Sequence, residues 1–233
     1  MVQRPIQRAD PASPAGPGTT PRCCVCEGET HGSFALCYCC GVLVGQLQLP
    51  LVPVVAMIEY ELADRMHCQL RGYKDAPVHE AREMYLRQLA RFVGDWMATN
   101  GHGLGRRLGS SWDVVTTVPS SRRPAGAPAD AILAMVPGLQ RMHCQMLARG
   151  PSPIGHLVAA RQGFVLDPGL DLHQFGNKTV LVVDDSIITG ARAQSAAAAL
   201  RIGGVRVAGV LAVGRALDPS RGIRVPPSCP RTG

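Results

Sequence analysis

The feature that most constrains the fold is a strand, loop, helix and second strand near the C-terminal end of this 233-residue chain. Residues 179–183 (TVLVV) form a continuous apolar run, which is typical of a strand buried on both faces of a parallel sheet. An Ala-rich helix is predicted over residues 191–202, ending at Gly203, and a second buried strand over residues 205–213. Together they form a βαβ unit. We therefore predict an α/β protein with a central, mostly parallel sheet flanked by helices.

The segment before this unit has the periodicity of further helices and strands. Apolar residues at helical spacing predict a helix over residues 77–100 that ends at Asn100. The glycine-rich residues 101–109 do not follow a strand, as a dinucleotide-binding loop would, and are expected to form a flexible loop. Two more elements are predicted: a short β-branched strand over residues 113–118 and a helix over residues 129–147 with a break at Pro137.

The composition of the chain ends and the net charge bear on the cellular location of the protein and on its partners. Residues 1–22 and 218–233 are rich in proline, glycine and small polar residues and are expected to be disordered. Residues 1–22 also lack the apolar core of a secretory signal. The most apolar stretch, residues 42–58, is interrupted by glutamines and prolines and does not resemble a membrane span. We expect a cytoplasmic protein without a membrane partner, and the formal net charge of +7 favours anionic partners without choosing among them.

Residues 23–49 are predicted to form a small zinc-binding module. Six of the nine cysteines lie within residues 23–40, and four of them form two pairs with two-residue spacing: Cys23, Cys26, Cys37 and Cys40. Such pairs let four thiolates converge on one Zn²⁺ ion in a closed tetrahedral shell, which is normally structural. Cys24 or Cys39 would be able to replace a neighbour, and His31 is expected to be a loop residue. Free or redox-active thiols without a metal are the alternative.

The turn after the strand at residues 179–183 has the features of a phosphate- and ribose-binding site. The N–H groups at the start of the following helix favour an anion, and Gly190 permits close backbone approach. Thr189 adds a hydroxyl group. Asp184 and Asp185 lie at the carboxyl end of the strand, where open α/β sheets bind ligands. Two acids beside an anion site suit a ligand that also carries a vicinal diol, such as a 5-phosphorylated ribose, although a plain βαβ unit with incidental acids is the alternative.

This stretch resembles the signature of type I phosphoribosyltransferases: an apolar strand, two acidic residues, three variable residues and Thr-Gly. The resemblance implies that Asp184 and Asp185 hold the ribose of phosphoribosyl pyrophosphate, which reacts together with Mg²⁺. It also implies that the next six residues surround the 5-phosphate: Ser186, Ile187, Ile188, Thr189, Gly190 and Ala191. A response-regulator receiver begins similarly, but the 48 residues that follow Asp185 are too few to complete one.

A zinc module ahead of such a domain is similar to the ComF family of competence-associated, amidophosphoribosyltransferase-like proteins. Three other segments resemble that family: residues 70–74 (LRGYK), residues 113–119 (DVVTTVP) and residues 164–166 (FVL). The resemblance implies a type I phosphoribosyltransferase domain over residues 50–217. Candidate pyrophosphate contacts are Lys74, Ser120, Ser121, Arg122 and Arg123. Two positions depart from the family pattern: Ile188 stands where Thr or Asp is common, and Arg192 stands where Thr is common. Arg192 would either pair with a phosphate or point to solvent.

These observations support several functional hypotheses. The first is an enzyme that transfers a 5-phosphoribosyl group to a nitrogen acceptor, or hydrolyses that bond. The second is a non-enzymatic protein that senses a phosphoribosyl ligand in the same pocket, with partners among the DNA-uptake and single-strand-handling proteins that the ComF resemblance implies. Direct binding of single-stranded DNA ranks last, because such sites use stacking aromatic residues and the chain has only ten.

Overall fold

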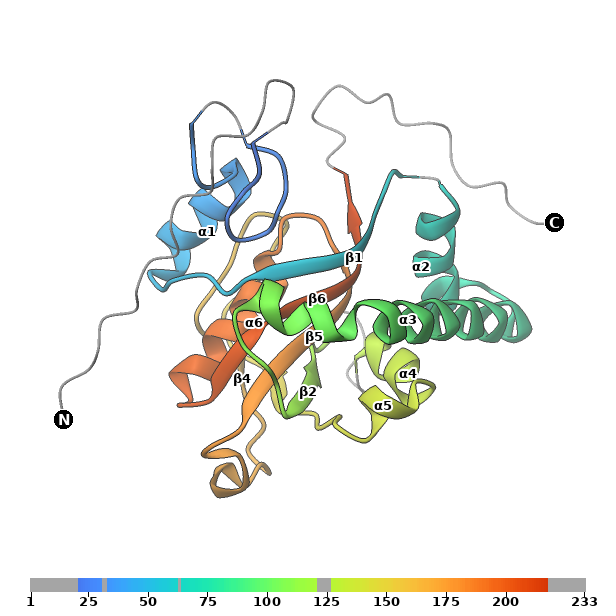
Figure 1. Cartoon of the computed structure of the whole chain (residues 1–233). Helices are drawn as coiled ribbons and strands as arrows, with labels where there is room; N and C mark the ends of the chain where they lie inside the picture. The colour runs from blue at the N-terminus through green and yellow to red at the C-terminus, as the bar shows by residue number, and fades with distance from the viewer. Residues whose placement is uncertain (1–20, 31–32, 63, 121–126, 218–233) are drawn as a thin grey trace.

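The computed structural model describes residues 21–30, 33–62, 64–120 and 127–217. Its centre is a four-stranded, fully parallel sheet with the order β1-β6-β5-β2 (Figure 1). The strands of this sheet are β1 (Val54–Tyr60), β2 (Val114–Thr117), β5 (Thr179–Ile187) and β6 (Arg206–Ala216). A separate antiparallel pair consists of β3 (Leu147–Arg149) and β4 (Phe164–Leu166). The prediction of an α/β protein with a parallel sheet is confirmed.

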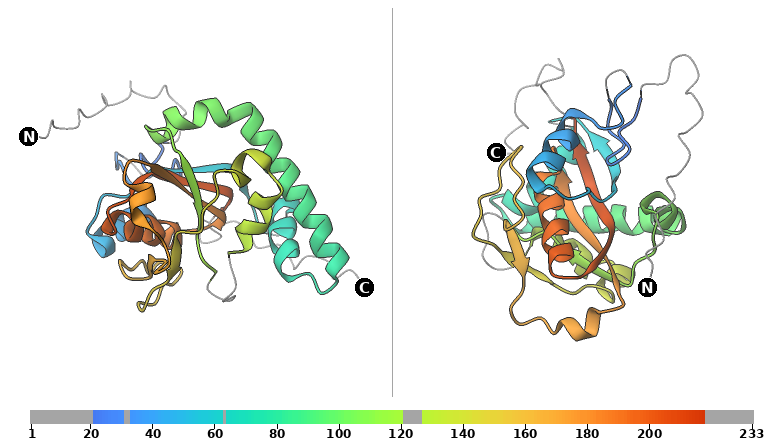
Figure 2. Two further views of the ribbon diagram at one scale, coloured as in Figure 1. Left: turned by 90° about the horizontal axis from the view of Figure 1, so that it is seen from below. Right: turned by 90° about the vertical axis from the view of Figure 1, so that its left-hand side faces the viewer.

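Helices cover both faces of the sheet (Figure 2). They are α1 (Tyr38–Leu47), α2 (Arg65–Asp75), α3 (His79–Leu108), α4 (Pro128–Ala134), α5 (Pro137–Gln140) and α6 (Ala191–Ile202), with a 3₁₀ turn η1 (Leu172–Phe175). The α6 helix follows β5 and leads into β6, so the predicted βαβ unit is present. The first and last residues of α6, at positions 191 and 202, match the prediction for this helix.

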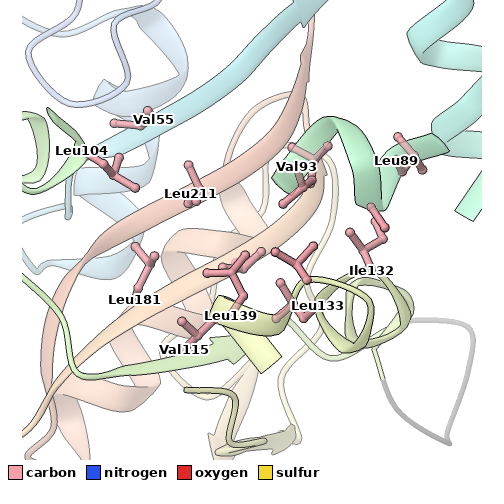
Figure 3. Close-up of a cluster of buried hydrophobic side chains, with 14 of the residues drawn as sticks. Val55, Leu89, Val93, Leu104, Val115, Ile132, Leu133, Leu139, Leu181 and Leu211 are labelled. Carbon is pink, nitrogen blue, oxygen red and sulfur yellow. The ribbon is translucent and has the colours of Figure 1, made fainter. Parts of the chain in front are cut away.

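The apolar run in β5 is continuous because its side chains alternate between two hydrophobic cores. Leu181, which is labelled in Figure 3, and Val183 pack in the core beneath α3 and α4. Val180 and Val182 pack in the core beneath α6, together with Phe164 of β4. A strand covered on both faces needs an apolar residue at every position, which distinguishes it from the alternating pattern of a half-exposed strand.

The prediction that the helix beginning near residue 77 ends at Asn100 is wrong, as is the flexible loop predicted over residues 101–109. The α3 helix continues to Leu108 and ends at Gly109, which has a φ of 71°. Leu104 and Leu108 lie one turn apart and are buried in the core against the sheet. Their burial outweighs the unfavourable helix propensity of Gly101, Gly103 and Gly105, which is roughly 1 kcal/mol for each.

The helix predicted over residues 129–147 is also partly wrong. It is helical in α4 and α5, with the expected break between them, but residues 141–146 are not helical and Leu147 begins β3. Here the chain runs beside β2: Val115 N–H donates to the carbonyl of Met142, and Cys144 N–H donates to the carbonyl of Val115, each at 2.9 Å. These bonds satisfy the outer edge of β2, which no local pattern in the sequence indicates.

None of the helices within the described ranges combines the length and the apolar character that crossing a bilayer demands.

The close contact of α3 with the sheet predicts the effect of two glycine substitutions. A Cβ atom at Gly209 in β6 would lie 2.6 Å from Leu108 Cδ2 and 2.7 Å from the carbonyl oxygen of Pro53. We expect Gly209→Ala to lower the free energy of unfolding by roughly 1–3 kcal/mol through overpacking. Gly94→Ala, within α3 and with open space around the new methyl group, is the matched control and is expected to be neutral or stabilising by about 1 kcal/mol. Urea denaturation of both variants measures this, and equal effects would contradict the packing.

Candidate functional site

The candidate site is a cavity of about 410 Å³ at the carboxyl end of the parallel sheet. Asp184 and Asp185, at the end of β5, line it together with the β5–α6 turn, which we define as residues 186–191. Both carboxylates are buried. Ser120, just beyond β2, and Lys74, from α2, line the same cavity. The structure therefore brings together every predicted site residue of this region that it describes, whereas Ser121, Arg122 and Arg123 lie outside the described residues.

The β5–α6 turn offers backbone donors to this cavity. In the part of the chain that the structure describes, no protein acceptor receives the N–H groups of Ile188, Thr189 and Gly190. Gly190 has a φ of 81°, a left-handed conformation that favours glycine, and α6 begins at the next residue without a side-chain cap. Unpaired N–H groups beside a helix N-terminus are suited to bind an anion.

Two neighbouring residues of α2 contact Asp185. The hydroxyl of Tyr73 donates a hydrogen bond to Asp185 Oδ2, and the ammonium of Lys74 forms an ion pair with the same oxygen. Lys74 therefore lines the candidate site from a helix, with its ammonium beside the acid pair. The fold gives the acidic pair a positive neighbour, which reduces the cost of burying two adjacent carboxylates.

Asp184 is the more unusual member of the pair. Burial, and then the charge of Asp185, raises the pKa of Asp184 to about 7, although Arg192 and Lys74 oppose this change. Its Oδ1 accepts a hydrogen bond of 3.0 Å from the N–H group of Asp185. A carboxyl group with such a pKa changes charge near neutral pH, which is frequent among residues of functional sites.

Three residues that the sequence does not point to contact the β5–α6 turn or the acid pair before it. Tyr60, at the end of β1, has its hydroxyl 2.6 Å from Ser186 Oγ. The carbonyl of His156 accepts the hydroxyl hydrogen of Thr189, so a bound phosphate would compete with this carbonyl for that donor. Tyr73 lies within residues 70–74, which resemble the ComF family, but only Lys74 of that segment was a candidate site residue. Tyr60 and His156 carry no local sequence signal.

Arg192 lies in the first turn of α6, where the sequence suggested either phosphate pairing or solvent exposure. Its guanidinium lines the cavity and donates a hydrogen bond to the carbonyl of Pro119, just beyond β2. It therefore links the start of α6 to the end of a neighbouring strand. Ile188, in the β5–α6 turn, is 46% exposed, and its side chain presents no polar group to the cavity.

The four predicted cysteine ligands form a second candidate site. One sulfur from each of Cys23, Cys26, Cys37 and Cys40 lies within 4.8 Å of the others. The distance between the sulfurs of Cys26 and Cys37 is 3.7 Å, close to the edge of about 3.8 Å for a tetrahedron with Zn–S bonds of about 2.3 Å. The arrangement of the four sulfurs fits one Zn²⁺ ion, and the distance between the sulfurs of Cys26 and Cys37 is too long for a disulfide bond.

The two cysteines that were alternative ligands, Cys24 and Cys39, do not belong to the group of four converging sulfurs. Among the described residues, the group that could hold a metal ion contains neither Cys24, which is exposed, nor Cys39. Cys24 N–H instead donates to the carbonyl of Ala35, 2.9 Å away, within the module. His31 lies outside the described residues. A closed shell of four thiolates would cross-link the module without leaving a position open for chemistry.

A comparison with models of known families finds no match to this chain, and a comparison with curated proteins also finds none.

The cysteine geometry predicts which thiols retain a metal. We expect Cys23→Ser to lose bound zinc, because it removes one of four ligands. Cys24→Ser, the adjacent and exposed position, is the control and is expected to retain one zinc ion per chain. Metal analysis of the purified variants distinguishes them, and a lower melting temperature is expected for Cys23→Ser alone. Loss of zinc from both variants, or from neither, would contradict the assignment.

The raised pKa of Asp184 predicts a pH-dependent stability. In the unfolded chain this carboxyl ionises near pH 4, whereas the folded chain holds its proton until about pH 7. The folded state therefore binds more protons between these values, and stability falls as pH rises through this window. We expect Asp184→Asn to be more stable than the wild type at pH 8, by on the order of 2–4 kcal/mol, with a gain that shrinks toward pH 4. Asp95→Asn, an exposed carboxylate on α3, should show no such trend in urea unfolding.

Proposed function

We propose that this chain is a phosphoribosyltransferase-like protein of the ComF type. It would bind phosphoribosyl pyrophosphate, or a related 5-phosphoribosyl ligand, together with Mg²⁺. It would transfer the phosphoribosyl group to a nitrogen acceptor. The observation that carries the proposal is one cavity in which unpaired backbone donors of the β5–α6 turn lie beside the buried pair Asp184 and Asp185.

The 5-phosphate would bind at the β5–α6 turn. Its oxygens would accept hydrogen bonds from the N–H groups of Ile188, Thr189 and Gly190, and the dipole of α6 adds a favourable potential there. Arg192, in the first turn of that helix, supplies a positive charge at the same end of the cavity. A volume of about 410 Å³ lies within the range of known small-molecule sites.

The ribose diol would bind at the two carboxylates. Hydroxyl hydrogens would donate to Asp184 and Asp185, and Lys74 would move from Asp185 toward the pyrophosphate. Carboxylates and phosphate oxygens are the ligands with which proteins hold Mg²⁺, and this ion would neutralise charge on the leaving pyrophosphate. The acid pair therefore suits both the diol and the metal that accompanies the substrate.

The chain's own contribution to the reaction would be position and electrostatics. In the transfer, the C1–O bond to pyrophosphate breaks with its electron pair on the leaving oxygen, and the nitrogen lone pair forms the new C1–N bond. Positive charge develops on the ribose during this step. The carboxylates of Asp184 and Asp185 would stabilise that charge, while the turn would hold the 5-phosphate in place.

A second candidate is a ComF-like protein that senses the same ligand without turnover and acts through DNA-uptake or single-strand-handling partners. Ile188 favours this version, because an apolar side chain in the turn provides neither a donor nor a base. The attachment of Arg192 to Pro119 also supports it, since that guanidinium is already engaged.

Calorimetric titration with phosphoribosyl pyrophosphate and Mg²⁺ tests the pocket independently of the acceptor. We expect binding by the wild type and a loss of at least about tenfold in affinity for Asp185→Asn, which removes a charged acceptor from the diol. Asp95→Asn is the matched control and should bind as the wild type does. An absence of heat with the wild type would overturn the proposal. If the wild type binds the ligand, release of pyrophosphate in the presence of amines or bases would favour the enzyme, whereas binding without release would favour the sensor.

A further inference from the structure

The α1 helix lies between the four-cysteine site and the β5–α6 turn. Cys37 precedes its first residue and Cys40 lies in its first turn, and both sulfurs belong to the group that could hold a metal ion. The helix has ten residues, no side-chain cap at its N-terminus and no acidic residue in its first turn. A helix of this length is marginal on its own, so its first turn depends on outside support. Ligation of two of its thiolates by one ion would supply that support.

One turn after Cys40, α1 packs directly behind the start of α6. Leu43 is fully buried and shares a cluster with Ala191 and Ala198 of α6. Its Cδ1 atom lies 4.0 Å from the position that a Cβ atom would take at Gly190. The side chain of Leu43 therefore lies in contact range of the end of the β5–α6 turn.

The next turn of α1 holds the segment that supports Thr189. Gln46 Nε2 donates to the carbonyl of Leu157 at 2.9 Å, and Gln46 Oε1 accepts the N–H group of Ala159 at 2.8 Å. These bonds fix the chain on the C-terminal side of His156, whose carbonyl accepts the Thr189 hydroxyl. A continuous series of contacts thus runs from Cys40 through α1 to both Thr189 and Gly190.

Within the described residues, this side of the turn borders a cavity. A cavity of about 270 Å³ separates the residues around Cys26, Cys37 and Cys40 from the rear of Ile187, Ile188, Thr189 and Gly190. In the described part of the chain, α1 supports the turn on this side through Leu43 and through the Gln46 bonds to residues 157 and 159.

We infer that Leu43 and Gln46 are positioning residues for the β5–α6 turn, and that metal bound by the four cysteines orders the turn through α1. Loss of the metal would then weaken phosphate binding at a site that the metal does not touch. The part of the inference that concerns a phosphate ligand rests on the proposed function. The mechanical coupling does not, and it has a test that needs no ligand.

Amide hydrogen exchange tests the coupling. The informative amides are those of Gln194, which donates to the carbonyl of Gly190, and Gly155, which donates to the carbonyl of Val158, both at 2.9 Å. Gly203, whose N–H donates to the carbonyl of Ala199 at the other end of α6, is the internal control. After zinc is removed by a chelator, we expect exchange of Gln194 and Gly155 to rise about fivefold or more, with Gly203 changed less than about twofold. Exchange that rises within α1 but not at Gln194 would overturn the inference.

Gln46→Ala tests the same series of contacts with the metal still bound, so the result does not depend on how the chain tolerates chelation. It removes two hydrogen bonds, each of which contributes roughly two- to tenfold in an equilibrium constant. We expect one zinc ion per chain, faster exchange at Gln194, and an affinity for ribose 5-phosphate with Mg²⁺ that falls about two- to tenfold. Gln140→Ala, an exposed glutamine at the end of α5, should change none of these. Unchanged exchange at Gln194 in Gln46→Ala would also overturn the inference.

These outcomes separate the two proposals. If the wild type binds no phosphoribosyl ligand while the exchange effects occur, the proposed function fails and the coupling stands. If the wild type binds the ligand and neither perturbation alters exchange at Gln194, the coupling fails and the proposed function stands.

Discussion

The constraint that most shapes the candidate site is the cost of burying two adjacent carboxylates, Asp184 and Asp185, at the end of a strand. Removing charged groups from water costs several kcal/mol for each group unless partners compensate. Here the compensation comes from other elements: Tyr73 and Lys74 of α2 contact Asp185, and Arg192 of α6 lowers the cost for Asp184. The acid pair therefore requires α2 and α6 to converge on one end of β5. A cavity with charges of both signs results from this convergence.

The parts of the fold that the sequence predicts are those whose pattern is local. The β5–α6–β6 unit was predictable because burial on both faces requires a continuous apolar run, and because glycines at residues 203 and 204 end the helix. The C-terminal third of α3 was not predictable, since its glycines argue against a helix and only contact with the sheet reverses that preference. The prediction of a helix after α5 was wrong for a similar reason, because the hydrogen bonds of that segment are made with β2.

The same distinction applies to the candidate sites. Asp184, Asp185 and the turn after them are contiguous, and the cysteine pairs have a spacing that favours convergence, so the grouping of these residues could be predicted from the sequence. Tyr73 is 112 residues from Asp185, and Tyr60 is 126 residues from Ser186. No local pattern joins positions so distant. The choice between Cys23 and Cys24 required the fold as well, because it depends on which thiol points inward and which is exposed.

The combination of open donors and buried acids limits the kind of ligand that would complete the site. A simple anion would satisfy the N–H groups of the β5–α6 turn, but it would leave Asp184 with its raised pKa and add negative charge beside it. A cation alone would relieve the acids and compete with Lys74, yet leave the N–H groups without acceptors. A ligand with a phosphate at one end, and hydroxyl donors or a metal ion at the other, satisfies both halves at once. The site is thus suited to a molecule of mixed polarity, and its two unfavourable features, unpaired donors and crowded carboxylates, are the ones that such a ligand would remove.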